Sequence, residues 1–131
     1  MKITFLGTAS AHPTSDRNHS GMLIDIGPES FLFDCGENIQ RQIRIAGISP
    51  MKISKIFITH WHGDHVIGLV GLVQSMELNC RKTVLDIYGP EGSAQNFHVI
   101  RKAFGINTGF KIDVHDVKSG KAFVSEDFEV L

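Results

Sequence analysis

The sequence predicts an α/β fold in which helices cover one face of a mixed β-sheet. Strand-like segments form a meander first and then alternate with helix-like segments, which is the pattern of this layer packing. A buried-strand run, Lys55–Thr59, also passes almost directly into an apolar segment at helical spacing, Val66–Asn79. With 131 residues the chain is long enough for one domain with one core. We therefore assign residues 1–131 to a single domain.

The strands are predicted where short runs of β-branched, aromatic and other apolar residues lie between turn-forming residues. In chain order they are Lys2–Leu6, Met22–Ile26, Phe31–Asp34, Lys55–Thr59, Val84–Tyr88 and Lys111–Val114. The turn Gly27–Ser30 joins the second and third of these as a hairpin. The final stretch, KAFVSEDFEVL, indicates two further short strands that pair with each other.

The helices are predicted where apolar residues recur every three to four positions. They are Asn38–Ala46, Val66–Asn79 and Gly92–Phe104. Gly47 and Gly105 follow the first and the last of them, as glycine often does where the chain turns left-handed at the end of a helix.

Composition excludes several classes of protein. No apolar stretch is long enough to span a bilayer, and the start of the chain reads as a strand rather than a signal peptide. Cys35 and Cys80 do not form a disulfide framework, so we expect a cytoplasmic protein with no membrane association. A net charge of −1 does not predict a nucleic-acid-binding domain. The basic pairs are each either a solvated surface or a set of phosphate contacts: Arg41 with Arg44, Arg81 with Lys82, and Arg101 with Lys102.

A dense group of polar residues occupies the junction between a strand and a helix: His60, His62, Asp64 and His65. Side chains two positions apart in extended backbone point the same way, so His60 and His62 face one point in space. Gly63 lets the chain turn, and Asp64 is predicted to cap the helix that His65 opens. Asp64 and His65 then face a second point, next to the one that His60 and His62 face. Imidazole and carboxylate groups bind zinc, and two adjacent metal ions suit displacement at phosphorus.

The H-x-H-x-D-H cluster after a buried strand resembles the metallo-β-lactamase superfamily of binuclear zinc hydrolases. Three other stretches narrow the resemblance to ribonuclease Z, a tRNA 3′-processing endonuclease: FLGTASAHPTSDRNHSGMLI, LFDCGENIQRQI and LDIYGPEG. These motifs cover about the first ninety residues, and the resemblance is weak beyond them. The resemblance implies a metallo-β-lactamase-like αβ/βα sandwich, of which this chain forms the N-terminal αβ half.

The resemblance also implies a cofactor and a reaction. His60 and His62 would bind one zinc ion, and Asp64 and His65 a second, with manganese or magnesium as alternatives. Asp64 would be catalytic, because it orients or deprotonates the attacking water. The expected reaction removes 3′ trailers from precursor tRNA. The remaining family ligands lie downstream of residue 131, so we expect this chain to be inactive alone, and to pair with its C-terminal half or as a homodimer.

Residues near the motif each allow two interpretations. Asp34 either accepts a hydrogen bond from a metal-binding imidazole or caps a turn. The resemblance places Pro13–Arg17 beside the tRNA 3′ end, where Arg17 is either a phosphate contact or part of a surface salt bridge. Ser15 stands where family members often carry a basic residue. His12 is either a substitute metal ligand or an ordinary loop residue.

Two other functions stay open. One is a different metallo-β-lactamase-fold hydrolase, acting on a small ester, lactone or phosphodiester; the ribonuclease Z motifs argue against it. The other is a non-catalytic, truncated paralogue that binds a partner or RNA, which the missing ligands favour.

Overall fold

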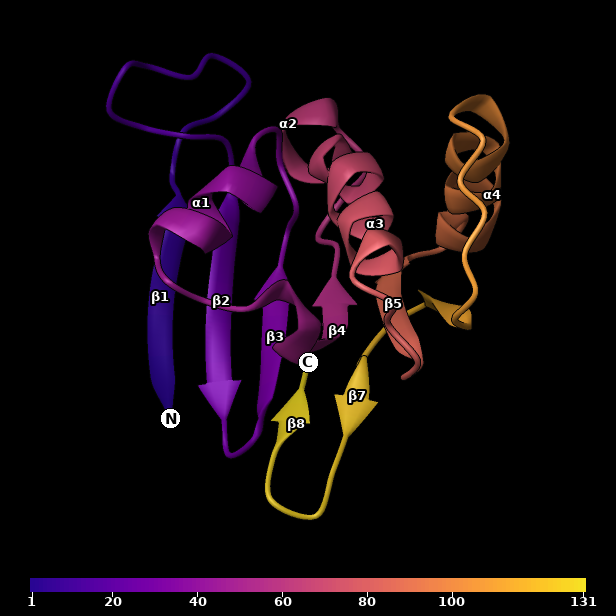
Figure 1. Cartoon of the computed structure of the whole chain (residues 1–131). Helices are drawn as coiled ribbons and strands as arrows, with labels where there is room; N and C mark the ends of the chain where they lie inside the picture. Colours follow the sequence, from indigo (N-terminus) through magenta and orange to yellow (C-terminus); the bar gives the residue numbers. More distant parts are fainter.

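The computed structural model describes residues 1–131 and contains a six-stranded mixed sheet with helices on one face (Figure 1). Its strands lie in chain order: β1 Lys2–Gly7, β2 Gly21–Ile26, β3 Glu29–Phe33, β4 Ile53–Phe57, β5 Leu85–Pro90 and β6 Ile112–Val117. β1, β2 and β3 pair antiparallel, whereas β3 to β6 run parallel. The predicted mixed α/β architecture is therefore confirmed.

The helices lie between the parallel strands in sequence: α1 Ile39–Ile45, the 3₁₀ turn η1 Pro50–Lys52, α2 Gly63–Val66, α3 Gly68–Leu78 and α4 Ser93–Ala103. A separate two-stranded hairpin follows, formed by β7 Phe123–Val124 and β8 Glu129–Val130. This hairpin was predicted. So were the left-handed residues after α1 and α4, since Gly47 and Gly105 have φ angles of 68° and 60°.

The single helix predicted for Val66–Asn79 is divided in the structure. Helical backbone begins earlier, at Gly63, and α2 and α3 are separated at Ile67, whose own backbone keeps right-handed helical angles (φ −60°, ψ −31°). The N–H of Gly68 donates to the carbonyl of Cys35 at 2.9 Å. This tertiary hydrogen bond satisfies the N–H from outside the helix, and hydrophobic periodicity carries no sign of it.

The helix-facing side of the sheet forms the core. Leu23, Leu32, Ile56 and Ile87 lie side by side across β2 to β5 and are fully buried. Residues of α1 and α3 join them in one apolar cluster. Burial of this kind is the main favourable contribution to folding.

The opposite face carries a row of aromatic rings. Phe33, Phe57, Tyr88 and His115 are paired in register across β3 to β6. Their ring centroids are separated by 4.9, 5.0 and 4.5 Å, with nearly parallel planes. The β7–β8 hairpin packs on Phe31 in the neighbouring row. At the β1 end, by contrast, Phe5 is 69% exposed, so this face is covered only in part.

The topology brings several strand ends to one edge of the sheet. In open α/β sheets, ligands bind beyond the carboxyl ends of parallel strands. Asp34 follows β3, and Thr59 to His62 follow β4. No helix in the structure has the length and apolar character needed to cross a membrane.

Candidate metal centre and adjoining pocket

The polar motif follows β4 as an extended segment and then enters the helical turn α2. His62 is the N-cap of α2, with φ −81° and ψ 150°, and Asp64 lies within the first turn. The prediction that Asp64 caps the helix was therefore wrong by two residues. The helix starts earlier because the N–H of His65 already donates to the carbonyl of His62, at 2.9 Å.

The structure brings the motif side chains together. The ring centroid of His60 lies 4.7 Å from that of His62 and 4.0 Å from that of His65. The Nε2 atom of His65 lies 3.4 Å from a carboxylate oxygen of Asp64. His60 therefore lies next to its expected partner His62 and also next to His65 of the other expected pair. The four side chains form one cluster.

Asp34 connects this cluster to the end of β3. Its backbone is left-handed, with φ 58°, and its carboxylate is buried. The carboxylate accepts hydrogen bonds from the N–H of Thr59 at 2.9 Å and from Nδ1 of His65 at 2.7 Å. Of the two interpretations of Asp34, the geometry favours the partner of an imidazole.

Thr59 is a site residue that the sequence analysis missed. Its Oγ1 lies 3.0 Å from both oxygens of Asp34 and 3.0 Å from Nδ1 of His60. A hydroxyl can donate one hydrogen bond. The Thr59 hydroxyl donates it to Asp34, because a carboxylate can only accept. The Nδ1 of His60 must then donate to Thr59. The one available signal was its position between the strand and the first motif histidine.

This network selects the tautomer of two imidazoles. With Nδ1 protonated in both His60 and His65, each ring keeps its Nε2 lone pair for another partner. Hydrogen bonding of the remaining nitrogen to a carboxylate or hydroxyl is how metal-binding histidines are usually oriented. The donor set of three imidazoles and one carboxylate matches the chemistry that Zn²⁺ prefers.

The residues present fit a divalent cation but do not form a complete site. No group of three or more His, Cys, Asp or Glu side chains is arranged to hold a metal ion. Cys35, next to Asp34, adds no ligand, because burial raises the pKa of its thiol and the charge of Asp34 raises it further, whereas metals bind the thiolate.

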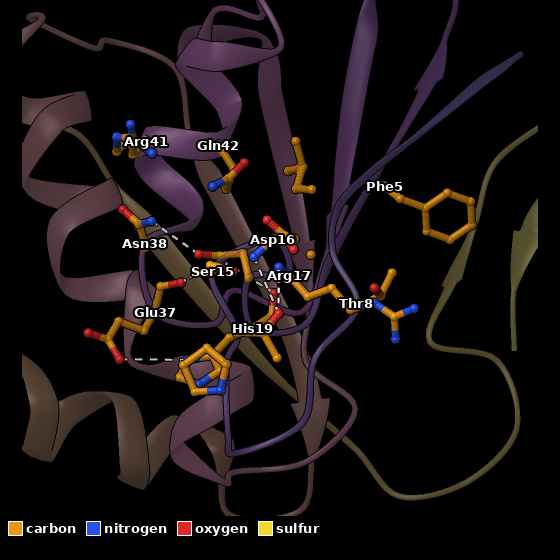
Figure 2. A pocket seen from close by; sticks show the side chains of 15 residues that line it. Phe5, Thr8, Ser15, Asp16, Arg17, His19, Glu37, Asn38, Arg41 and Gln42 are labelled. Atoms are coloured by element: carbon orange, nitrogen blue, oxygen red, sulfur yellow. Dashed lines mark hydrogen bonds and ion pairs between the residues drawn. The ribbon is translucent and has the colours of Figure 1, made fainter.

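A polar pocket of about 710 Å³ is lined by residues that precede the motif in the sequence (Figure 2). Its lining comes from β1, from the loop between β1 and β2, and from the start of α1. Arg17 and Arg41 supply cationic groups from the loop and the helix, while Asp16 and Glu37 supply anionic ones. The predicted substrate residue Arg17 therefore lines a cavity with a second arginine.

Gly36 lies close both to the motif and to the pocket lining. A Cβ at this position would collide with the carbonyl of Asp64, which belongs to the motif, and with Cβ of His19, which lines the pocket. His19 is buried and its Nε2 has no hydrogen-bond partner, whereas its Nδ1 lies 3.7 Å from Glu37. Only glycine permits the loop after β3 to pass between them. His12, by contrast, is exposed and lies outside the pocket lining.

Comparisons with known proteins identify the family of the chain. The family model described as Anti-Pycsar protein Apyc1 matches residues 1–127. The chain belongs to this family. The chain is also 48% identical to ribonuclease Z from Methanothermobacter thermautotrophicus, covering 99% of this chain and 42% of that relative. It is 49% identical to ribonuclease Z from Methanococcus aeolicus, covering 98% and 40%.

Solved structures with the same fold include human tRNase Z, short form, with a TM-score of 0.82 and 36% identity over 92% of this chain and 46% of that one. The metallo-β-lactamase fold protein YhfI from Bacillus subtilis gives a TM-score of 0.77 at 20% identity, covering 97% and 49%. The metallo-β-lactamase-like fold and the resemblance to ribonuclease Z are therefore confirmed.

Two points qualify the sequence analysis. The similarity to ribonuclease Z extends over almost the whole chain, well beyond the opening motifs to which it was assigned. The chain also spans only about 40% of the length of the curated relatives it matches.

Proposed function

We propose that this chain is the metal-binding part of a metal-dependent endoribonuclease that removes 3′ trailers from precursor tRNA. The observation that carries this proposal is the joining of His60 and His65 through Thr59 and Asp34, in a chain similar to ribonuclease Z along its whole length. We also propose that residues 1–131 are one domain, equivalent to the N-terminal αβ half of the sandwich.

In this proposal the motif residues hold two zinc ions, His60 and His62 at one and Asp64 and His65 at the other, with manganese or magnesium as substitutes. Zinc, when bound, supplies positive charge that activates water and stabilises the transition state at phosphorus. Asp64 orients the attacking water or removes its proton. Asp34 and Thr59 hold the imidazole rings, and Arg17 in the adjoining pocket binds a phosphate of the RNA.

The proposed partners are precursor tRNA and a protein surface that covers the aromatic face of the sheet. That surface is either the C-terminal half of the sandwich or a second copy of this chain in a homodimer. The exposed Phe5 and Ile3 at the β1 end support an uncovered apolar surface of this kind. We place the protein in the cytoplasm, which its two free cysteines support.

The test is an assay of a 3′-extended precursor tRNA with zinc or manganese. One tube contains this chain alone, and a second contains this chain with the C-terminal half of a ribonuclease Z. We expect a product with a 3′-hydroxyl only in the second tube, lost in His62→Ala and kept in His98→Ala, whose histidine lies on α4. Cleavage by the chain alone would show that the site is completed within residues 1–131 or across a homodimer.

A second candidate function is favoured by the family model, whose name is that of an anti-Pycsar protein rather than of ribonuclease Z. In this alternative the same residues act on a phosphodiester other than precursor tRNA. A chromogenic phosphodiester tested beside the tRNA in both tubes separates the two. Metal and RNA binding without turnover of either substrate would instead indicate a non-catalytic binding protein.

A further inference from the structure

Trp61, the single tryptophan of the chain, lies between His60 and His62. Its side chain is half-buried and packs against the apolar core. The indole Nε1 donates a hydrogen bond of 2.7 Å to Oγ of Ser93, and that hydroxyl donates to the carbonyl of Pro90 at 2.6 Å. Trp61 thus ties the motif to the connection between β5 and α4.

This contact is tightly constrained. Ser93 is fully buried, and its one hydroxyl proton goes to Pro90, so the hydroxyl accepts the indole N–H. A Cβ on Gly89 would collide with Ser93 Oγ, so the hydroxyl occupies the space that glycine leaves. The N–H of Ile58 donates to the carbonyl of Tyr88 at 2.7 Å, which fixes the end of β4 against β5 just before the motif.

The position of the Trp61 side chain determines the direction of the side chains of His60 and His62. In extended backbone, alternate side chains point to opposite sides. An indole held inward by Ser93 therefore turns the side chains before and after it outward. On the other flank, Thr59 is held by Asp34. The segment that carries His60 and His62 is thus held at Thr59 by Asp34, which follows β3, and at Trp61 by Ser93, the first residue of α4.

We propose that Trp61 and Ser93 are positioning residues that set the orientation of His60 and His62 for metal binding. This proposal rests on the proposed function, because it assigns to the pair an effect on the metal that those histidines hold. A purely structural role predicts something different. In that case, loss of the hydrogen bond lowers stability and leaves the metal site unchanged.

The decisive variants are Trp61→Phe, which keeps an aromatic ring but removes the N–H, and Ser93→Ala, which removes the acceptor. Ser30→Ala is the matched control, since Ser30 is an equally buried serine whose hydroxyl donates to Asp25, in β2. Full-length chains are titrated with Co²⁺, followed by visible absorption, and with Zn²⁺ in competition with a chromophoric chelator.

We expect Trp61→Phe and Ser93→Ala each to weaken metal affinity about 10- to 100-fold, as loss of ligand-orienting partners does, and to alter the Co²⁺ spectrum. The double variant should be no weaker than the weaker single variant, because both remove the same bond. Ser30→Ala should bind as wild type does. Wild-type affinity and spectra in Trp61→Phe and Ser93→Ala would overturn the proposal.

A metal-free measurement separates this proposal from the proposed function. The single indole N–H gives one NMR signal, which should exchange slowly with solvent in wild type and fast in Ser93→Ala. The ring signals of His60 and His62 should shift in Ser93→Ala and in Trp61→Phe but not in Ser30→Ala. If wild type binds no metal, the assignment of the metal ligands fails, and the ring signals of His60 and His62 alone test whether Trp61 and Ser93 position these histidines. Unshifted signals would refute the positioning role. If Ser93→Ala does not fold, Trp61→Phe carries the test.

Discussion

The Nδ1 atom of His65 lies 2.7 Å from the Oδ2 atom of Asp34. Asp34 follows β3, whereas His65 lies in the turn after β4, so the contact joins the ends of two neighbouring parallel strands. It leaves the Nε2 atom of His65 as the nitrogen that can bind a cation. The same carboxylate also accepts from Thr59, which makes Asp34 the common support of the candidate metal centre.

Asp34→Asn tests this support. The N–H of Thr59 and the Nδ1 of His65 bond to different oxygens of Asp34, and an amide replaces one of those oxygens by an NH₂ donor, so one of the two donors loses its acceptor. We expect zinc affinity to fall about 10- to 100-fold, measured by competition with a chromophoric chelator. Asp86→Asn is the matched control, because Asp86 pairs with His115 at 2.8 Å on the opposite face of the sheet. An equal loss of affinity in both variants would contradict a specific role for Asp34.

Phe57→Ala tests the aromatic row. Phe57 is 5% exposed and stacks between Phe33 and Tyr88. Its truncation should lower the free energy of unfolding by about 3–5 kcal/mol, measured by chemical denaturation. Phe5→Ala, at an exposed ring of the same face, should change it by less than about 0.5 kcal/mol. A similar change in the free energy of unfolding at both positions would mean that stacking in the aromatic row does not stabilise the fold.

Arg81→Ala tests a buried cation. Arg81 belongs to a basic pair interpreted from sequence as a solvated surface or a phosphate contact, yet it is only 2% exposed. Its guanidinium donates to the carbonyls of Thr83 and Val84, each at 2.8 Å. Burial lowers its pKa from the ordinary value.

Removal of the Arg81 side chain leaves those carbonyls without their donors, and a hydrogen bond from a charged group contributes about 1.5–3 kcal/mol. The denaturation midpoint should therefore fall sharply in Arg81→Ala and stay near the wild-type value in Arg44→Ala, whose side chain is exposed. Unchanged midpoints in both variants would show that Arg81 is not needed for the fold.

Asp116→Asn tests a helix cap that depends on pH. The carboxylate of Asp116 accepts from the backbone N–H groups of Ala94 and Gly92, at 2.9 and 3.0 Å, and these bonds lower its pKa. A folded-state pKa below the unfolded value means that the charged form stabilises the fold above the ordinary aspartate pKa. That contribution is lost as the pH falls through the lowered value.

Wild type should therefore be more stable than Asp116→Asn at neutral pH, and the two should converge in strong acid. Thermal unfolding across the acidic range measures this difference. Glu126→Gln, at an exposed carboxylate in the β7–β8 turn, controls for general loss of charge. A difference between wild type and Asp116→Asn that persists unchanged in strong acid would rule out the charged cap.

The sequence was informative where local pattern decides the outcome. Every strand and the helices α1, α3 and α4 lie where apolar periodicity or turn residues predicted one, because these patterns reflect burial on one or both faces; the short helix α2 begins before its predicted start. The dense histidine cluster also identified the candidate metal centre, since its composition is difficult to explain by packing alone.

What could not be predicted depends on contacts between distant segments. The division of the helix at Ile67 needs the carbonyl of Cys35, and the role of Ser93 needs β5 beside β4. The burial of Arg81 likewise depends on distant partners, since its Nη1 lies 3.5 Å from the carbonyl oxygen of Met51 and its guanidinium lies 5.6 Å from the ring centroid of Phe110. The hydrophobic periodicity of one segment does not predict which distant segment will contact it.

Two hydrogen bonds made from within the motif have a consequence for the order of folding. His65 reaches back 31 residues to Asp34, and Trp61 reaches forward 32 residues to Ser93. Closing loops of this length costs chain entropy before either contact contributes stability. The cluster therefore acquires its native arrangement only after β3, β4 and β5 have aligned. We therefore expect the indole N–H of Trp61 and the Nδ1–H of His65 to gain their hydrogen-bond partners late in folding, after the local turns and helices have formed.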